Sequence, residues 1–152
     1  MIATNHGVLA GSINLHIAFD INLGHRVQAD HCQWLHGHQY KIEFVLEGLD
    51  QDIDTSRGNL RSELCEALGD WLSDHWEEAF LFHAGDDVAR AAAACIPGQK
   101  VYPMPYAPTP ENIARHLLED VCPKILVDLD VRATHVAVEE NESIAAVASV
   151  FG

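Results

Sequence analysis

The sequence predicts an α+β fold in which two strands, two helices and two further strands follow one another. Apolar residues alternate with polar ones near the N-terminus, recur at helical spacing in the middle, and alternate again near the C-terminus. This order favours a four-stranded antiparallel sheet with both helices on one of its faces. Because 152 residues with 48% apolar content are the size of one globular core, we expect residues 1–152 to form a single domain.

The first two strands come from two alternating segments. Apolar residues occupy the odd positions from Ile13 to Leu23, which predicts a strand with one buried face. Tyr40 opens a second alternating run that continues to Leu46, and the acidic, turn-rich segment GLDQDIDTSRGN then ends it. We therefore expect a pair of neighbouring strands joined by a loop of residues 26–35.

Two helices are expected in the middle of the chain. The first runs from about residue 60 into the seventies, where apolar residues recur every three or four positions: Leu60, Leu64, Leu68, Trp71 and Leu72. The second begins at Thr109, an N-cap hydroxyl followed by Pro110 and Glu111. Between them, DDVARAAAAC could form a short helix, and GQKVYPMPYAP, with three prolines, is expected to be an extended connection.

The last two strands are short. Residues 132–140, RATHVAVEE, alternate through Thr134, Val136 and Val138, and residues 143–151, SIAAVASVF, form the final candidate. These segments complete the predicted sheet.

Charge and cysteine content limit the function. The chain carries 23 acidic and 9 basic residues, for a net charge of −14, which argues against nucleic-acid binding because phosphate backbones require clustered Lys and Arg. An anionic substrate would need the few basic groups, such as Arg26 and Lys41, to gather at one pocket. The N-terminus lacks the pattern of a signal peptide, and no later run is long and apolar enough for a membrane span. The four cysteines form no Cys-x-x-Cys motif. We therefore expect a cytoplasmic protein with reduced thiols and no membrane partner.

The stretch HCQWLHGHQY, residues 31–40, carries the strongest chemical signal. His36 and His38 are two residues apart, so in a strand both rings point to the same face. His25 ends the first strand, and an antiparallel hairpin would bring it to the same edge of the sheet. Three imidazoles suit Zn²⁺ and leave a fourth position open, as in catalytic zinc sites. The other seven histidines are expected at the surface or in hydrogen-bonded core positions, and the same could hold for these three.

Four segments, in this order, resemble one family over most of the chain: INLGHRV, CQWLHGHQY, YAPTPENIARHL and VAVEEN. The family is 6-pyruvoyl-tetrahydropterin synthase with its bacterial relative 6-carboxytetrahydropterin synthase, which has the T-fold. The resemblance implies that His25, His36 and His38 hold zinc and that Cys32 is the acid/base thiol. Read without the resemblance, Cys32 is either a small buried apolar residue or a thiol made reactive by a nearby cation.

The resemblance also implies the ligand and the assembly. Glu140 would bind the 2-amino edge of a pterin through two parallel N–H bonds, with a supporting contact from Thr109. Thr109 could instead act only as an N-cap, and Glu140 could be a solvated strand end with Glu139 or Glu142 in its place. Family members eliminate triphosphate from 7,8-dihydroneopterin triphosphate, and the bacterial branch also releases acetaldehyde to form 6-carboxytetrahydropterin on the route to queuosine. The short Cys-x-x-x-His-Gly-His spacer looks closer to that bacterial branch, so the resemblance favours its activity. The family assembles trimers that pair as hexamers, so we also expect a homo-oligomer.

The chain departs from the family pattern near the end of the first helix. In the family, this helix ends with an Asp-His pair, followed by an apolar segment, and the histidine assists proton transfer. When the segment AFLF of this chain is aligned with that apolar segment, Glu77 falls at the aspartate and Glu78 at the histidine. Either His75 or His83 could replace the missing imidazole, and the two glutamates could equally be a solvated helix end. Three functions therefore remain open beside the leading one: 6-pyruvoyl-tetrahydropterin synthase activity, non-catalytic pterin or purine binding, and a structural metal site.

Overall fold

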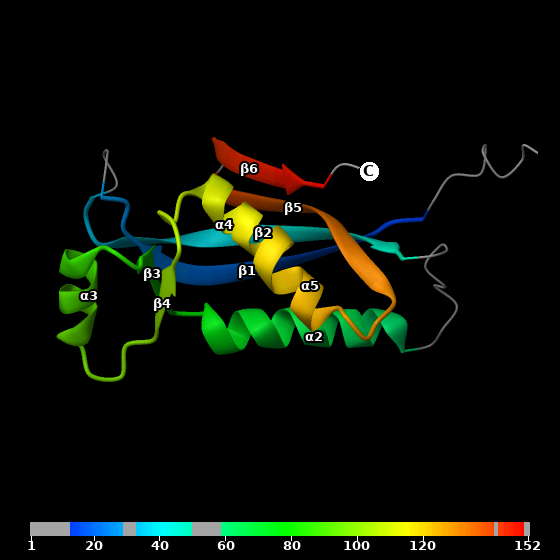
Figure 1. The fold of residues 1–152 in the computed structure, drawn as a ribbon, viewed down its shortest axis with the longest axis horizontal. Coiled ribbons are helices and arrows are strands. Elements are labelled where there is room, and N and C mark those ends of the chain that lie inside the picture. Colours follow the sequence, from blue (N-terminus) through cyan, green and yellow to red (C-terminus); the bar gives the residue numbers. More distant parts are fainter. Residues whose placement is uncertain (1–12, 29–32, 50–58, 142, 151–152) are drawn as a thin grey trace, which may run out of the picture.

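One twisted sheet forms the centre of the structure, a computed structural model that describes residues 13–28, 33–49, 59–141 and 143–150 (Figure 1). Its strands lie in the order β4-β3-β1-β2-β5-β6. The strands are β1 Leu15–His25, β2 His36–Gly48, β3 Phe80–His83, β4 Val101–Met104, β5 Val131–Asn141 and β6 Ile144–Ser149. The helices are α2 Leu60–His75, α3 Asp87–Ala94, α4 Pro110–His116 and α5 Cys122–Ile125, with a π-helical turn, η1 Leu117–Val121, between the last two.

Strands β1 and β2 form the long antiparallel pair that the alternating segments predict. The register runs from Leu15 opposite Leu46 to His25 opposite His36. Residues on the odd positions of β1, such as Ile21 and Leu23, are buried, whereas the even positions between them are more exposed. The buried face of this pair therefore continues through His25 at the end of β1.

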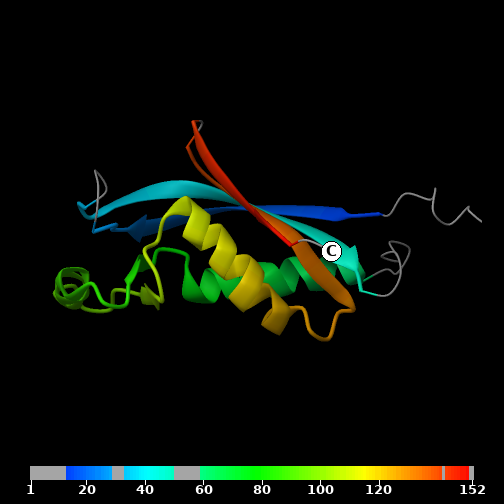
Figure 2. The ribbon, with the colours of Figure 1, turned by 45° about the horizontal axis from the view of Figure 1, so that its top comes forward.

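Helices cover the buried face of the sheet. Figure 2 shows α2, α4 and α5 beneath the long strands, while α3 lies beyond the end of the sheet near β3 and β4. Helix α2 buries the four leucines of the predicted stripe, Leu60, Leu64, Leu68 and Leu72. Thr109 is the N-cap of α4 as predicted, with its side chain accepting from Asn112 N. Both expected helices and the short α3 are thus confirmed, and no helix within the described ranges is long and apolar enough to cross a membrane.

The four predicted strands are present and pair antiparallel, but the sheet has six strands, so the predicted number of strands is wrong. Strand β3 pairs parallel with β1, and β4 pairs parallel with β3, so two short strands extend the sheet beyond β1. Residues 98–108 were expected to be only a connection because of their prolines, yet Val101–Met104 is a strand. Since β4 lies at the sheet edge, the missing N–H of Pro103 is tolerated there.

Candidate metal centre

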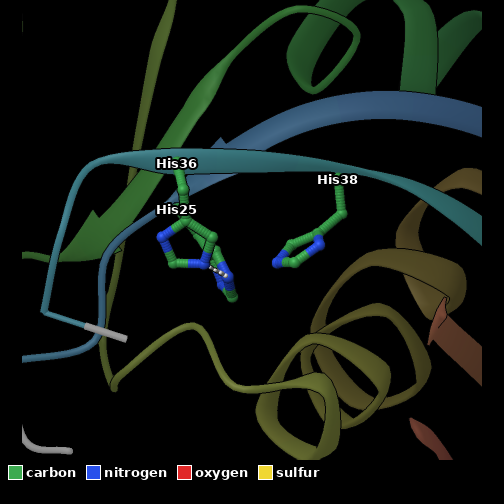
Figure 3. Close-up of side chains that lie close together, drawn as sticks. All are labelled: His25, His36 and His38. Carbon is green, nitrogen blue, oxygen red and sulfur yellow. Dashed lines mark hydrogen bonds between the residues drawn. The ribbon is translucent and has the colours of Figure 1, made fainter. Parts of the chain in front are cut away.

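Three imidazoles meet where β1 ends and β2 begins. His25 pairs directly with His36, and His38 lies two residues further along β2, so all three side chains project from the same face. Figure 3 shows the three rings on one side of the strands, above the segment that leads into α4. Their possible ligand nitrogens all lie within 4.8 Å of one another. The structure therefore brings the three predicted metal ligands together.

Backbone carbonyls hold two of these rings in a defined orientation. His25 Nδ1 donates to Pro108 O at 2.9 Å, and His36 Nδ1 donates to Trp34 O at 2.7 Å. A carbonyl oxygen can only accept, so each neutral ring keeps its hydrogen on Nδ1 and its lone pair on Nε2. Metal-binding histidines in proteins are oriented by such contacts.

The Nε2 atoms of the two rings face each other. His25 Nε2 lies 2.8 Å from His36 Nε2. Burial lowers the pKa of His25 to about 4, so its ring is neutral near pH 7. The lone pair of the neutral His25 ring therefore points at His36 Nε2, and a metal ion shared by the two nitrogens would be attracted to both.

The third imidazole has a buried ring nitrogen that makes no hydrogen bond. His38 Nε2 makes no hydrogen bond to any residue in the described part of the chain. It lies 3.1 Å from Glu140 Oε1 without forming a hydrogen bond to it. A buried polar atom without a partner is costly in a folded protein. Three imidazoles with one such orphaned nitrogen fit a transition-metal ion, and a set of three protein ligands leaves room for a further one.

The two residues expected to bind substrate lie beside this cluster. Glu140 on β5 is only 9% exposed, and its carboxylate is next to His38. Thr109 Oγ1 accepts from Asn112 N at 3.2 Å, so the hydroxyl caps α4 as the simpler interpretation requires. It directly follows Pro108, whose carbonyl binds His25, which places the start of α4 against the metal centre.

Tyr40 is a part of the site that the sequence did not reveal. Its side chain is completely buried, and its hydroxyl lies 3.3 Å from both ring nitrogens of His25. The signal was present in the strand alternation, because Tyr40 follows His36 and His38 at the same two-residue spacing. The strand pattern identified Tyr40 only as a core residue.

The family profile of 6-pyruvoyl tetrahydropterin synthase matches residues 14–150. The chain belongs to this family. The 6-carboxy-5,6,7,8-tetrahydropterin synthase of Rickettsia bellii is 30% identical over 113 residues, which cover 70% of this chain and 78% of the relative. The protein of the same description from Rickettsia conorii is 29% identical over 129 residues, covering 80% and 89%.

Solved structures show the same fold. An uncharacterized protein from Wolinella succinogenes superposes with a TM-score of 0.64 at 19% identity, covering 91% of this chain and 99% of the other. The 6-pyruvoyl tetrahydropterin synthase of Plasmodium falciparum gives 0.59 at 13% identity, with coverage of 91% and 98%. The predicted T-fold is therefore confirmed, with six strands in place of the expected four.

Glu77 and Glu78, the acidic pair expected at the position of the family's Asp-His, lie beside β1 and outside the three-imidazole cluster. Glu77 accepts from the backbone and side-chain nitrogens of Asn22, at 3.2 and 3.4 Å. Glu78 has a positive φ of 60° and lines a cavity of about 580 Å³. Asn22 and Gly37 also line this cavity, and both are on strand positions that point away from the three imidazoles. Glu77 and Glu78 are not part of the three-imidazole cluster, although His36 and His38 also line the cavity that Glu78 borders.

Neither of the suggested replacement histidines joins the cluster. The His75 ring stacks on Trp71 with 4.6 Å between centroids, and its Nδ1 donates to Trp71 O. His83 ends β3, where its ring lies close to Gly85. The group of possible ligands that the described residues form contains only His25, His36 and His38.

The predicted catalytic thiol, Cys32, lies outside the described residues, so its role stays a prediction. Of the other cysteines, Cys122 is buried, and this burial raises its pKa to about 12. It therefore remains a protonated thiol and behaves as an apolar core residue.

Proposed function

We propose that this protein is a zinc-dependent lyase that acts on 7,8-dihydroneopterin triphosphate in the manner of a 6-carboxytetrahydropterin synthase. The observation that carries the proposal is the convergence of three imidazoles, two of them oriented by backbone carbonyls, beside the buried carboxylate of Glu140. Relatives described as 6-carboxy-5,6,7,8-tetrahydropterin synthase support this choice among the activities of the family.

His25, His36 and His38 would hold the zinc ion. When bound, zinc would supply a Lewis acid with an open coordination position for substrate oxygen. Glu140 would accept two N–H bonds from the 2-amino-pyrimidinone edge of the pterin, because an ionised carboxylate offers two acceptor oxygens in the matching geometry. The Thr109 hydroxyl, whose oxygen already accepts from Asn112, can still donate its hydrogen to the ligand.

Proton transfer is assigned to Cys32, which precedes the metal ligand His36 by four residues. A nearby cation lowers the pKa of a thiol and so favours the thiolate that can accept a proton. Glu78 stands at the position of the family's assisting imidazole, so its carboxylate would have to take over that proton transfer. In the Plasmodium vivax 6-pyruvoyltetrahydropterin synthase, a glutamate is described as a catalytic residue.

Turnover of the zinc-loaded protein tests the proposal. Incubation with 7,8-dihydroneopterin triphosphate should release triphosphate and acetaldehyde and form 6-carboxytetrahydropterin, whereas protein stripped of zinc should not. Triphosphate release without acetaldehyde would instead indicate 6-pyruvoyl-tetrahydropterin synthase activity. A protein that binds zinc stoichiometrically but releases no triphosphate would exclude both lyase activities.

A non-catalytic pterin or purine binder is the second candidate. It is favoured by one observation, the glutamate at the position of the family's proton-transferring histidine. Such a protein would bind a pterin tightly at the metal centre without turnover, and Cys32→Ala would leave that affinity unchanged. Loss of measurable turnover in Cys32→Ala, with pterin affinity retained, would contradict this alternative.

A further inference from the structure

Arg26, the residue directly after the metal ligand His25, forms a buried ion pair. Its Nη1 donates to Asp86 Oδ2, and the two side chains are 15% and 0% exposed. The other carboxylate oxygen of Asp86 accepts from Ala89 N at 3.1 Å and caps helix α3. The pair therefore joins the end of β1 to the start of α3.

The same guanidinium holds the segment that precedes β2. Arg26 Nε donates to Gln33 O at 2.7 Å. Gln33 is exposed, Trp34 is 70% exposed and Leu35 is 56% exposed, so burial of side chains does little to hold this segment. A contact to its backbone therefore matters more here than it would in a packed segment.

This segment carries the carbonyl that orients a metal ligand. Trp34 follows Gln33, and its carbonyl accepts from His36 Nδ1. Displacing the Gln33 carbonyl would shift the adjoining peptide and so the Trp34 carbonyl. His36 would then lose the contact that keeps its hydrogen on Nδ1 and directs Nε2 toward His25.

We propose that Arg26 and Asp86 are positioning residues of the metal centre, fixing the Trp34 carbonyl and through it the orientation of His36. The inference rests on the proposed function, because it requires His25, His36 and His38 to hold a metal ion. A buried ion pair is often no more stabilising than apolar side chains of similar size, so stability alone does not explain the pair. The planar guanidinium can donate to Asp86 and Gln33 at once, whereas a lysine ammonium is a point charge without this fork.

Arg26→Lys tests the role of the fork while keeping the charge next to Asp86. We expect the dissociation constant for zinc, measured by competition with a chromogenic chelator, to rise about 10- to 100-fold. The visible absorption of the cobalt-substituted protein should change in position and intensity, because it reports the geometry of the ligands. The matched control is Arg132→Lys, which alters an Arg–carboxylate pair with Glu47 at the opposite end of β2.

A double variant separates positioning from folding. Arg26→Met with Asp86→Ser removes both buried charges and keeps a side chain that can cap α3. Its far-ultraviolet circular dichroism should match that of the wild type, while its zinc affinity and cobalt spectrum should resemble those of Arg26→Lys.

Two results would overturn the inference. The first is an Arg26→Lys variant that binds zinc as tightly as the wild type and has the wild-type cobalt spectrum. The second is a folded double variant that also keeps the wild-type zinc affinity and cobalt spectrum. Either would leave the lyase proposal intact, since that depends on zinc binding and turnover by the wild-type protein. A wild-type protein that binds no zinc would remove the metal centre and this inference together.

Discussion

At the residue scale, the site depends on which histidines have their Nε2 atoms directed to a common point. His16 and His25 lie on the same strand, but His16 is exposed and lies 3.6 Å from Glu43, whereas His25 is buried and bound to Pro108 O. What distinguishes His25, as a candidate ligand, from His16 is its position at the strand end and its backbone partner. Residue type alone does not distinguish the two.

Replacing one ligand should abolish tight metal binding. We expect His36→Ala to raise the dissociation constant for zinc by more than about 100-fold, because losing a ligand costs more than losing a residue that orients one. Isothermal titration calorimetry would measure the effect, with His16→Ala as the control that keeps wild-type affinity. Equal affinity in the two variants would show that the three imidazoles are not the metal site.

Glu140→Gln should weaken pterin binding while keeping side-chain volume. The amide offers one acceptor oxygen where the carboxylate offers two, and hydrogen bonds to charged groups contribute about 1.5–3 kcal/mol. We therefore expect a loss of about 10- to 150-fold in pterin affinity, measured by ligand fluorescence in the zinc-loaded protein. The control is Glu139→Gln, at the exposed neighbouring position, which should bind the pterin as tightly as the wild type does. If Glu139→Gln lost pterin affinity and Glu140→Gln did not, the residue that binds the pterin would be Glu139.

The side chains of the site were more predictable than the backbone groups that orient them. Strand alternation and chain order were sufficient to predict that His25 and His36 would meet. Nothing in the identities of Pro108 or Trp34 predicts that their carbonyls accept from these rings, since every residue carries a carbonyl. Tyr40 was predicted only as a core residue because an aromatic at an inward strand position is usually packing.

At the element scale, helix α4 supports the site through its N-terminus. Thr109 caps the helix and the preceding Pro108 contacts His25, so the same turn starts the helix and orients a metal ligand. The capping pattern of Thr109, Pro110 and Glu111 was readable in the sequence because N-caps depend on local side-chain chemistry. Its contact with β1 was not readable, because 83 residues separate His25 from Pro108.

Thr109→Val should destabilise the protein by about 1 kcal/mol, within the range of roughly 0.5–2 kcal/mol for a lost N-cap. Valine keeps the size and branching of threonine but cannot accept from Asn112 N. Thr109→Ser is the matched control, because it retains the hydroxyl and should remain near wild-type stability. Urea unfolding measures both, and equal midpoints for the two variants would contradict the capping role.

Strands β3 and β4 show why short elements escape sequence patterns. Phe80–His83 has only four residues, too few to establish a period of two, and three of them are apolar or aromatic in succession. Val101–Met104 contains a proline, which argues against a strand unless its place at the sheet edge is known. Strand β3 pairs parallel with β1 and β4 pairs parallel with β3, so both strands depend on contacts between segments that are not adjacent in the chain.

At the scale of the whole molecule, the sheet has two open edges, β4 and β6. An edge strand presents unpaired backbone groups that can pair with another chain, and proteins normally cover or charge such edges. Along β6, Ile144 is 46% exposed and Val147 is 64% exposed, and no charged residue lies between them. This edge is therefore suited to pairing with another copy of the chain.

We expect the protein to be a homo-oligomer built on trimers, with β6 at the contact between subunits. Val147→Lys should shift sedimentation velocity profiles toward the monomer, because a charged side chain on an edge strand opposes pairing with a second sheet. Val88→Lys on α3 is the matched control, since Val88 is also 64% exposed but lies outside the sheet edge, and it should sediment as the wild type does. A monomeric wild-type protein, or an oligomer unaffected by Val147→Lys, would contradict this assembly.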